Sequence, residues 1–334
     1  MFSRGKLGIL AIGVVAALGS AACTATDTGD DATKGNVTAT LGDANPQPIA
    51  SDPHPTLPVT AHGFDGTDVT IRDASRIIAV DRFGTLAQTV YALGLGGRLV
   101  GRSMSAKIPA LAGLPNVTPD GESMSVEAIL ALNPTVLLTD ATTATPAVFE
   151  QLRATGVPIV FFDPARTVNG TGPQIQAVAD ALGVHDQGVA LAQRTTTEIS
   201  AATTNLPATD PRVRIAFVYL RGTALTMLAG PGSGADALIT GLGAEDAGTA
   251  VGLSEPFVAI TSEAMIAARP DVLLVMTDGL ESIGGAAGLL RLPGIAQTPA
   301  GHAHRIVDMS DSVLLSFGPN TGRVLAALRP AVYR

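Results

Sequence analysis

The hydrophobic and polar positions of this chain follow one pattern twice, 136 positions apart. Ser125–Asp140 (SVEAILALNPTVLLTD) and Thr261–Met276 (TSEAMIAARPDVLLVM) align over 16 positions without a gap. In each copy a hydroxyl residue precedes a Glu, an apolar helical stretch leads to a Pro, and a β-branched run follows. A hydroxyl residue and an early acid suit the positive end of a helix, and a Pro ends the helix before it. Each copy therefore predicts a short helix followed by a buried parallel strand.

Strands and helices of similar length alternate through the rest of the chain, which predicts mostly parallel sheets. Because the module occurs twice, we expect an α/β fold of two Rossmann-like lobes, residues 67–184 and 207–334, with a ligand cleft between them. Residues 185–206 have the pattern of one long, mostly polar α-helix, which we expect to bridge the lobes. The alternative is an ordinary surface helix of the first lobe.

The N-terminus has the pattern of an export signal. Arg4 and Lys6 precede Leu7–Gly19, a stretch of 13 uncharged residues that is short for a membrane span and typical of a signal-peptide core. Small residues then lead to Cys23, the only cysteine of the chain. This junction resembles the lipobox of bacterial lipoproteins, which implies that residues 1–22 are removed and that a lipid on Cys23 anchors the chain to the outer face of the cell membrane. The alternative is a plain secretory signal with an incidental cysteine.

The residues that follow Cys23 show no periodic apolar pattern. Up to residue 66 the chain is rich in Thr, Asp, Gly, Pro and Ala. Such composition predicts a flexible tether over residues 23–66, with an end-to-end span of roughly 35 Å.

Composition argues against several classes of function. The formal net charge is −8 at pH 7 and Lys and Arg do not cluster, so we expect no nucleic-acid partner. The five histidines are too dispersed to suggest a zinc-type site, and no nucleophile motif of the GxSxG kind occurs. These features favour a binding protein over an enzyme.

Two glutamates occupy matching positions in the repeated module. Glu127 and Glu263 would each lie in the first turn of a helix, where a carboxylate stabilises the helix by up to about 1 kcal/mol. Because two equivalent lobes would each present one acid, the pair also suits docking onto basic residues of a two-fold symmetric partner.

From about Ser75 to Tyr333 the chain resembles the substrate-binding lipoproteins of iron-chelate, haem and cobalamin importers, the helical-backbone class of periplasmic binding proteins. The similarity is greatest to haem-binding members from Gram-positive bacteria. Besides the two modules, four phrases carry it: RIIAVDRFGTLAQTVYALGLGGRLVGRS (76–103), RIAFVYLRGTA (214–224), GPGSGADALI (230–239) and TPAGHAHRIVDMSDSVLLSFGP (298–319).

The resemblance implies two lobes joined by a single long helix, and a monomer without an intrinsic cofactor. Its partners would be an ABC permease dimer with its ATPase, and its transported ligand haem or a related ferric chelate. Glu127 and Glu263 match the acids of the family that pair with permease arginines.

At the ligand the chain departs from the family pattern. Where haem-binding members place a His and a Tyr, this chain has Glu122 and Met227, which we therefore take as tentative haem-iron ligands. The alternatives are that Glu122 is a solvated turn residue and that Met227 fills the core. Three further candidates end predicted strands, where ligands bind in parallel α/β sheets: Tyr219, Arg221 and Arg82. Either arginine could pair with a ligand carboxylate or be a surface charge.

Three other functions remain open at this point. A ferric siderophore or cobalamin supplies its own metal ligands, so the loss of His and Tyr favours such a ligand somewhat. A haem-handling or chelate-hydrolysing enzyme would need a nucleophile or base that the sequence does not show. A degenerate paralogue would act only as a structural or signalling partner.

Overall fold

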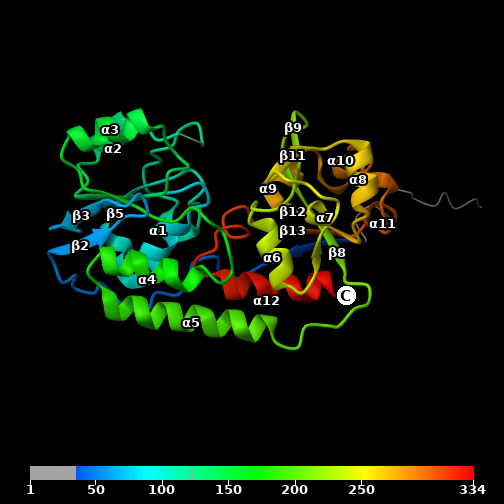
Figure 1. Ribbon diagram of the computed structural model, residues 1–334, viewed down its shortest axis with the longest axis horizontal. Helices are drawn as coiled ribbons and strands as arrows, with labels where there is room; N and C mark the ends of the chain where they lie inside the picture. The colour runs from blue at the N-terminus through cyan, green and yellow to red at the C-terminus, as the bar shows by residue number, and fades with distance from the viewer. Residues whose placement is uncertain (1–34, 122) are drawn as a thin grey trace, which may run out of the picture.

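The structure is a computed structural model that describes residues 35–121 and 123–334, and it has two α/β lobes side by side (Figure 1). The N-terminal lobe contains a four-stranded sheet in the order β5-β4-β6-β7, and all of its pairings are parallel. Its strands are β4 (Ile77–Val80), β5 (Leu99–Arg102), β6 (Val136–Thr139) and β7 (Ile159–Phe161).

The C-terminal lobe contains a seven-stranded mixed sheet in the order β1-β13-β12-β8-β9-β11, with β10 paired to β8. The pairings among β1, β13, β12, β8 and β10 are parallel, whereas β9 and β11 are antiparallel. The strands are β1 (Asn36–Ala39), β8 (Arg214–Arg221), β9 (Leu225–Ala229), β10 (Glu245–Asp246), β11 (Phe257–Ala259), β12 (Val272–Met276) and β13 (Ile306–Met309). Two lobes with mostly parallel sheets confirm the predicted fold class.

Helices surround both sheets, so the central strands β4, β6 and β12 are buried along their whole length. The helices are α1 (Thr85–Val90), α2 (Val126–Ala131), α3 (Pro146–Ala154), α4 (Thr171–Ala181), α5 (His185–Thr203), α6 (Ala235–Gly241), α7 (Ala247–Ala250), α8 (Ser262–Ala268), α9 (Thr277–Ser282), α10 (Gly285–Leu290), α11 (Pro299–His302) and α12 (Thr321–Val332). Within the described residues no helix combines the length and apolarity that a membrane crossing requires.

The two sequence modules fold alike, one in each lobe. In α2 the Ser125 hydroxyl accepts the Ala128 N–H at 3.2 Å, and in α8 the Thr261 hydroxyl accepts the Ala264 N–H at 3.1 Å. The strands that follow, β6 and β12, lie in separate sheets. The predicted caps and the predicted duplication are therefore confirmed.

The helices of the two modules also end alike. Asn133 and Arg269 precede the two prolines, and both have a left-handed φ of 43°. A residue before proline is disfavoured in the α region, and a left-handed residue ends the helix without extending it. The equivalent residues Arg76 and Arg214 then bind the free carbonyls, with Arg76 Nε 3.1 Å from Leu132 O and Arg214 Nη1 3.4 Å from Ala268 O. These arginine caps are not evident from the sequence.

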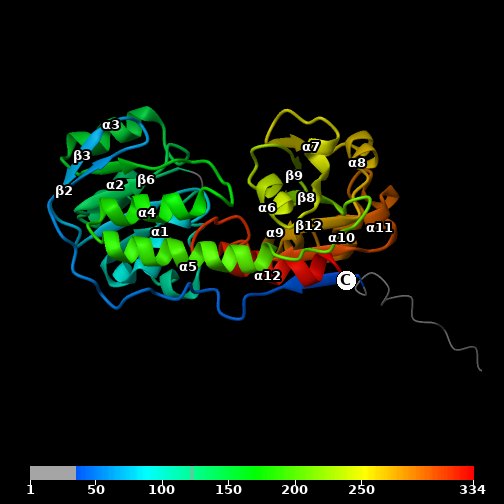
Figure 2. The ribbon, with the colours of Figure 1, turned by 60° about the horizontal axis from the view of Figure 1, so that its bottom comes forward.

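The 19-residue helix α5 joins the lobes, as predicted, and runs beneath both of them (Figure 2). It packs against α4 of the N-terminal lobe and α12 of the C-terminal lobe. Glycine makes both contacts close: a Cβ at Gly188 would lie 2.4 Å from Ala179 Cβ, and one at Gly322 would lie 2.5 Å from Glu198 Cβ. Because neither position has room for a side chain, α5 lies directly against the helix backbones of both lobes.

The predicted tether is wrong for the part of residues 23–66 that the structure describes. From residue 36 the chain forms β1, which pairs in parallel with β13, and Val59–His62 forms β2, which pairs with β3 (Asp68–Ile71). Residues 35–58, which we call the N-terminal strap, run from the C-terminal lobe to the N-terminal lobe (Figure 2). Residues 1–34, with the predicted signal and Cys23, lie outside the described residues.

Hydrogen bonds to strap backbone groups, together with a few partly buried apolar side chains such as Leu41 and Ile49, hold the N-terminal strap. The Ile49 and Asp52 N–H groups donate to carbonyls of the N-terminal lobe, at 2.7 Å to Ala92 and 3.2 Å to Gly94. On the other lobe, Arg323 of α12 donates to three strap carbonyls, those of Leu41, Asp43 and Asn45, at 3.1, 2.5 and 3.2 Å. The strap is thus a second connection between the lobes besides α5. The sequence did not predict this role, because the strap is ordered by contacts with distant residues of both lobes and not by a pattern of its own.

We predict that Arg323→Ala lowers the free energy of unfolding by about 1–3 kcal/mol, because it removes charge-assisted hydrogen bonds from a half-buried guanidinium. Urea titration measures the change, and hydrogen exchange of the Ile49 and Asp52 amides should accelerate with it. Arg153→Ala, which breaks an exposed ion pair with Asp65, is the matched control. Unchanged exchange at both amides would show that Arg323 does not hold the strap.

Candidate functional site

The loops at the carboxyl ends of the strands of both lobes face each other between the lobes (Figure 1). Hydrogen bonds and an ion pair cross from one lobe to the other. Thr85 Oγ1 donates to Ser316 O, Gln88 Nε2 lies 2.8 Å from Ser312 O, and Lys107 Nζ lies 3.6 Å from Asp278 Oδ2. Since ligands of open α/β sheets bind outside the carboxyl ends of the strands, this region is the candidate ligand site.

Tyr219 lies near the carboxyl end of β8, in the C-terminal lobe. It is half-buried, and its ring packs edge-on against Phe257 with the centroids 5.9 Å apart. The Arg221 guanidinium lies over the same ring, 4.7 Å from the centroid. The sequence placed both residues at a strand end, and the structure brings them into contact. This contact is a cation–π interaction between the guanidinium and the phenol ring.

Met227 lies opposite Tyr219 in the antiparallel pair of β8 and β9, and opposite Ala259 in the pair of β9 and β11. Directly opposite residues share one face of a sheet, so Met227 and Tyr219 are neighbours. The Met227 side chain is half-buried, whereas the adjacent Leu228 is buried on the other face. The structure therefore places two sequence candidates, Met227 and Tyr219, side by side.

Arg221 is held by an acid that the sequence analysis did not single out. Its Nη2 lies 3.0 Å from Asp311 Oδ1, and the Asp278 backbone N–H donates to Asp311 Oδ2 at 2.9 Å. Only 12% of the Asp311 side chain is exposed. Burial raises the pKa of Asp311, while the Asp278 N–H and Arg221 oppose this rise. Asp311 follows the strand β13, and this position after a buried strand is the signal that could have marked it.

Glu122, the other predicted iron ligand, lies outside the described residues. Its neighbour Gly121 has a φ of 84°, and a Cβ there would lie 3.2 Å from the Met104 sulfur. Met104 follows β5 and is half-buried. Gly121 thus lies close to Met104, at the carboxyl end of the N-terminal sheet.

Arg82 is exposed, and its Nη2 lies 3.3 Å from Thr142 O. Of the residues predicted to contact the ligand, it is the only described one in the N-terminal lobe. Tyr219, Arg221 and Met227 lie together in the other lobe, and Arg82 is not in contact with them in any hydrogen bond or ion pair of the described residues.

A buried charged cluster, not predicted from the sequence, lies beneath the site. Arg166 Nη2 is 3.0 Å from Asp140 Oδ2 and 3.4 Å from Asp81 Oδ1, and all three side chains are nearly inaccessible. Asp81 also accepts backbone N–H groups at the start of α1, including that of Leu86 at 2.8 Å. Burial raises the pKa of Asp81. Because these charges are mutually committed, we assign the cluster to the framework of the site rather than to the ligand.

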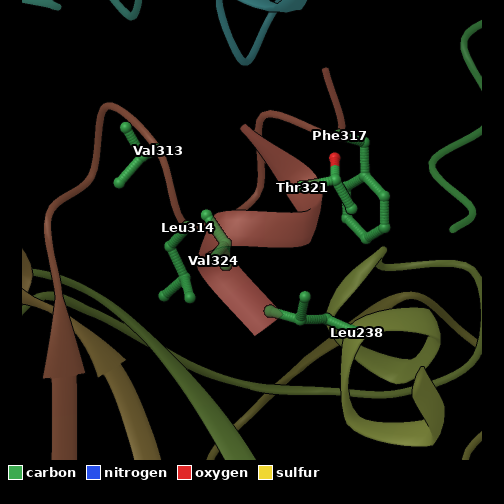
Figure 3. A pocket seen from close by; sticks show the side chains of 6 residues that line it. All are labelled: Leu238, Val313, Leu314, Phe317, Thr321 and Val324. Atoms are coloured by element: carbon green, nitrogen blue, oxygen red, sulfur yellow. The ribbon is translucent and has the colours of Figure 1, made fainter. Parts of the chain in front are cut away.

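The loop after β13 packs tightly against α6 and α12. Six side chains line the hollow where they meet, and it has no room for a water molecule (Figure 3). They are Leu238, Val313, Leu314, Phe317, Thr321 and Val324. This close packing fixes the loop that carries Asp311.

Within residues 35–121 and 123–334, no three His, Cys, Asp or Glu side chains are grouped so as to hold a metal ion.

Glu127 and Glu263 are both exposed in the first turns of α2 and α8. These helices lie on different lobes, on the side of the molecule away from α5 (Figure 1). Ile266, three residues after Glu263, is 46% exposed. The structure therefore presents one acid on each lobe, as the repeat predicted.

The family model for periplasmic binding proteins matches residues 82–313. The chain belongs to this family. Among solved structures, the haem-binding protein HmuT is 35% identical, covers 91% of this chain and 99% of its own, and has a TM-score of 0.85. The haem-binding protein RhuT from Roseiflexus sp. RS-1 is 37% identical, covers 78% of this chain and 98% of its own, and has a TM-score of 0.73. None of the proteins with curated annotation matches the chain.

Two details of these matches bear on the site. First, 91% of 334 residues is about 304, more than the 268 residues from 67 to 334, so the HmuT match extends into the segment predicted as a tether. Second, other HmuT structures carry alanine in place of a histidine, a tyrosine or an arginine, and that tyrosine and arginine are two positions apart. Tyr219 and Arg221 have the same spacing.

Proposed function

We propose that this protein is the substrate-binding component of an ABC importer, which captures haem or a related iron chelate between its lobes and delivers it to the permease. The observation that carries this proposal is the match to haem-binding HmuT along nearly the whole of both chains, at 35% identity. The contact between Tyr219 and Arg221 supports it within the site. In this role the iron chelate is cargo, and the protein performs no covalent chemistry on it.

Tyr219 is our first candidate for the iron ligand on the C-terminal lobe. Tyrosine oxygen is an established haem ligand, and the positive charge of Arg221 over the ring would stabilise the bound phenolate. Met227 is the second candidate, because a methionine sulfur also ligates haem iron and lies on the same face. From the other lobe, Glu122 would supply the opposite ligand, and Arg82 a further charge at the rim.

A ferric siderophore or cobalamin is the alternative ligand. The feature that favours it is Glu122, which stands where haem binders of this group place a histidine. A chelate that brings its own metal shell would need neither Tyr219 nor Met227 as a ligand, so the same variants separate the two ligand classes.

We predict that Tyr219→Phe abolishes the ligand-to-metal charge-transfer band of the haem complex and weakens haem binding at least tenfold, because the iron loses an oxygen ligand. Met227→Leu should leave this band in place. Haem titration of the apo-protein, followed by absorption in the Soret region, measures both. Tyr91→Phe, in the N-terminal lobe, is the matched control. An altered band in Met227→Leu but not in Tyr219→Phe would assign the ligand to Met227.

For delivery, we propose that Glu127 and Glu263 bind arginines of the two permease subunits, one lobe to each. Both carboxylates are exposed, and each lies in the first turn of its helix without contributing to the candidate site. We predict that the double substitution Glu127→Arg and Glu263→Arg abolishes haem uptake by cells, because like charges would then face each other at the docking surface.

The haem affinity of this double variant should equal that of the wild type, and Glu150→Arg, an exposed charge reversal on α3, should support normal uptake. A loss of haem affinity in the double variant would place these glutamates in the ligand site or the fold instead.

We also infer that the mature chain begins at a lipidated Cys23. The signal-like residues 1–22 and the small residues before Cys23 support this anchor. Since the N-terminal strap is bound to the folded body from residue 36, only about a dozen residues would separate the lipid from it. We predict that Cys23→Ser moves the protein from the membrane fraction to the soluble fraction of fractionated cells. An unchanged membrane fraction would point to a plain signal and another means of attachment.

A further inference from the structure

Large apolar side chains are exposed at four places in the part of the chain that the structure describes. They are Phe64 between β2 and β3, Val189 on α5, Leu225 at the start of β9 and Ile266 on α8. Leu225 lies opposite Arg221 and so belongs to the candidate ligand site. Ile266 follows Glu263 by three positions, which places the two side chains on one face of α8. An exposed apolar side chain therefore adjoins an acid proposed to bind the permease.

Both modules carry this combination on the outer face of their helices. An acid is followed by an aliphatic residue after three positions and by an alanine after four: Glu127, Leu130 and Ala131 on α2, and Glu263, Ile266 and Ala267 on α8. The acids and the alanines are exposed in both copies, whereas Ile129 and Met265 are fully buried on the inner face. The two helices thus present one pattern outward, and the small alanine leaves room for a partner to approach.

The aliphatic member of the pattern differs between the two lobes. Leu130 is half-buried, because it packs against the core of the N-terminal lobe that includes Ile129. Ile266 is 46% exposed instead. The C-terminal lobe therefore offers more apolar surface beside its acid than the N-terminal lobe does.

The helix α8 is held in the orientation that exposes Ile266. Met265 and Ala268 are buried on its inner face. The loop after α10 lies against its first turn, where Gly294 has a φ of 77° and a Cβ on this glycine would lie 2.6 Å from Ser262 O. Because α8 is fixed on these sides, the apolar surface of Ile266 is left for a partner.

We propose that Ile266 contacts apolar side chains of the permease and shields the ion pair of Glu263 from water, so that the C-terminal lobe binds the permease more strongly than the N-terminal lobe. This inference rests on the proposed delivery role and defines its partner surface as a basic residue bordered by apolar side chains. Excluding water lowers the local dielectric constant and strengthens an ion pair. Glu127, with the half-buried Leu130 beside it, gains less from this effect.

The symmetry of the partner makes this difference measurable. A two-fold symmetric permease presents the same surface to both lobes. Any difference in affinity between the lobes must then come from the receptor. Such docking has a stronger and a weaker side, so the N-terminal lobe can separate first while the C-terminal lobe remains bound.

The experiment measures binding of residues 23–334 with Cys23→Ser, loaded with haem, to the ABC permease and its ATPase in lipid nanodiscs by biolayer interferometry. We expect Ile266→Ser to weaken binding by about 3- to 10-fold, because an apolar contact is lost, and Ile266→Val to bind like the wild type. Val189→Ser is the matched control, since Val189 is 47% exposed on α5, away from the docking face (Figure 1). Haem affinity, measured by Soret titration, should be the same for all these variants.

A double-mutant cycle tests the shielding separately. Glu263→Gln should weaken binding more than Glu127→Gln does, and this excess should vanish in the Ile266→Ser background, because the ion pair is then open to water. Equal effects of the two glutamine substitutions in both backgrounds, or an unchanged affinity of Ile266→Ser, would overturn the inference and leave docking through the glutamates intact.

Two other outcomes would assign the Ile266 surface to another occupant and so overturn the inference. Equal binding to nanodiscs without permease would assign it to lipid. A dimer in analytical ultracentrifugation that Ile266→Ser dissociates would assign it to a second copy of this chain. A wild type that does not bind the permease-loaded nanodiscs would instead overturn the proposed delivery, and this inference with it.

Discussion

The close packing of α5 against both lobes is the constraint on which the arrangement of this protein depends. Gly188 lets α5 approach α4, and Gly322 lets α12 approach α5, so one rigid helix lies directly on the backbone of each lobe. This contact turns the carboxyl ends of the two sheets toward each other. The ligand site is a consequence of this orientation, because its residues come from loops that are far apart in the chain.

The N-terminal strap adds to this constraint. It joins the edge of the C-terminal sheet through β1 and then donates backbone hydrogen bonds to the N-terminal lobe. Two parallel connections, the strap and α5, limit relative rotation of the lobes more than a single helix would. We therefore expect small changes in lobe angle on binding, so specificity depends on the side chains already placed between the lobes rather than on a large closure.

Much of the fold could be predicted from the sequence because its signals are local. The caps at Ser125 and Thr261, the prolines after Asn133 and Arg269, and the apolar strands are read from neighbouring residues. The strap could not be predicted, because its order comes from partners such as Arg323, which is 280 positions from Asp43. Local composition describes a segment alone, and this segment is ordered only in contact with the rest of the chain.

The candidate site, too, could be predicted only where its signals are local. Tyr219 and Arg221 were found because they end a recognisable strand, and Met227 because of a family pattern, whereas the family pattern alone would not have set Tyr219 and Met227 side by side. Lys107 and Asp278 were missed because each is an ordinary exposed charge until the lobes are placed together. Asp311 was missed although it closely follows the buried strand β13. Charge pairing between lobes depends on the fold as a whole and leaves no local signal.

The central claim is that one duplicated module forms two halves of a receptor for an iron chelate. A crystal structure of the protein loaded with haem tests it most directly. The account predicts haem between the lobes, with its iron bound by a side chain of β8 or β9. Haem bound on an outer face, or beneath the N-terminal strap, with the region between the lobes empty, would contradict it.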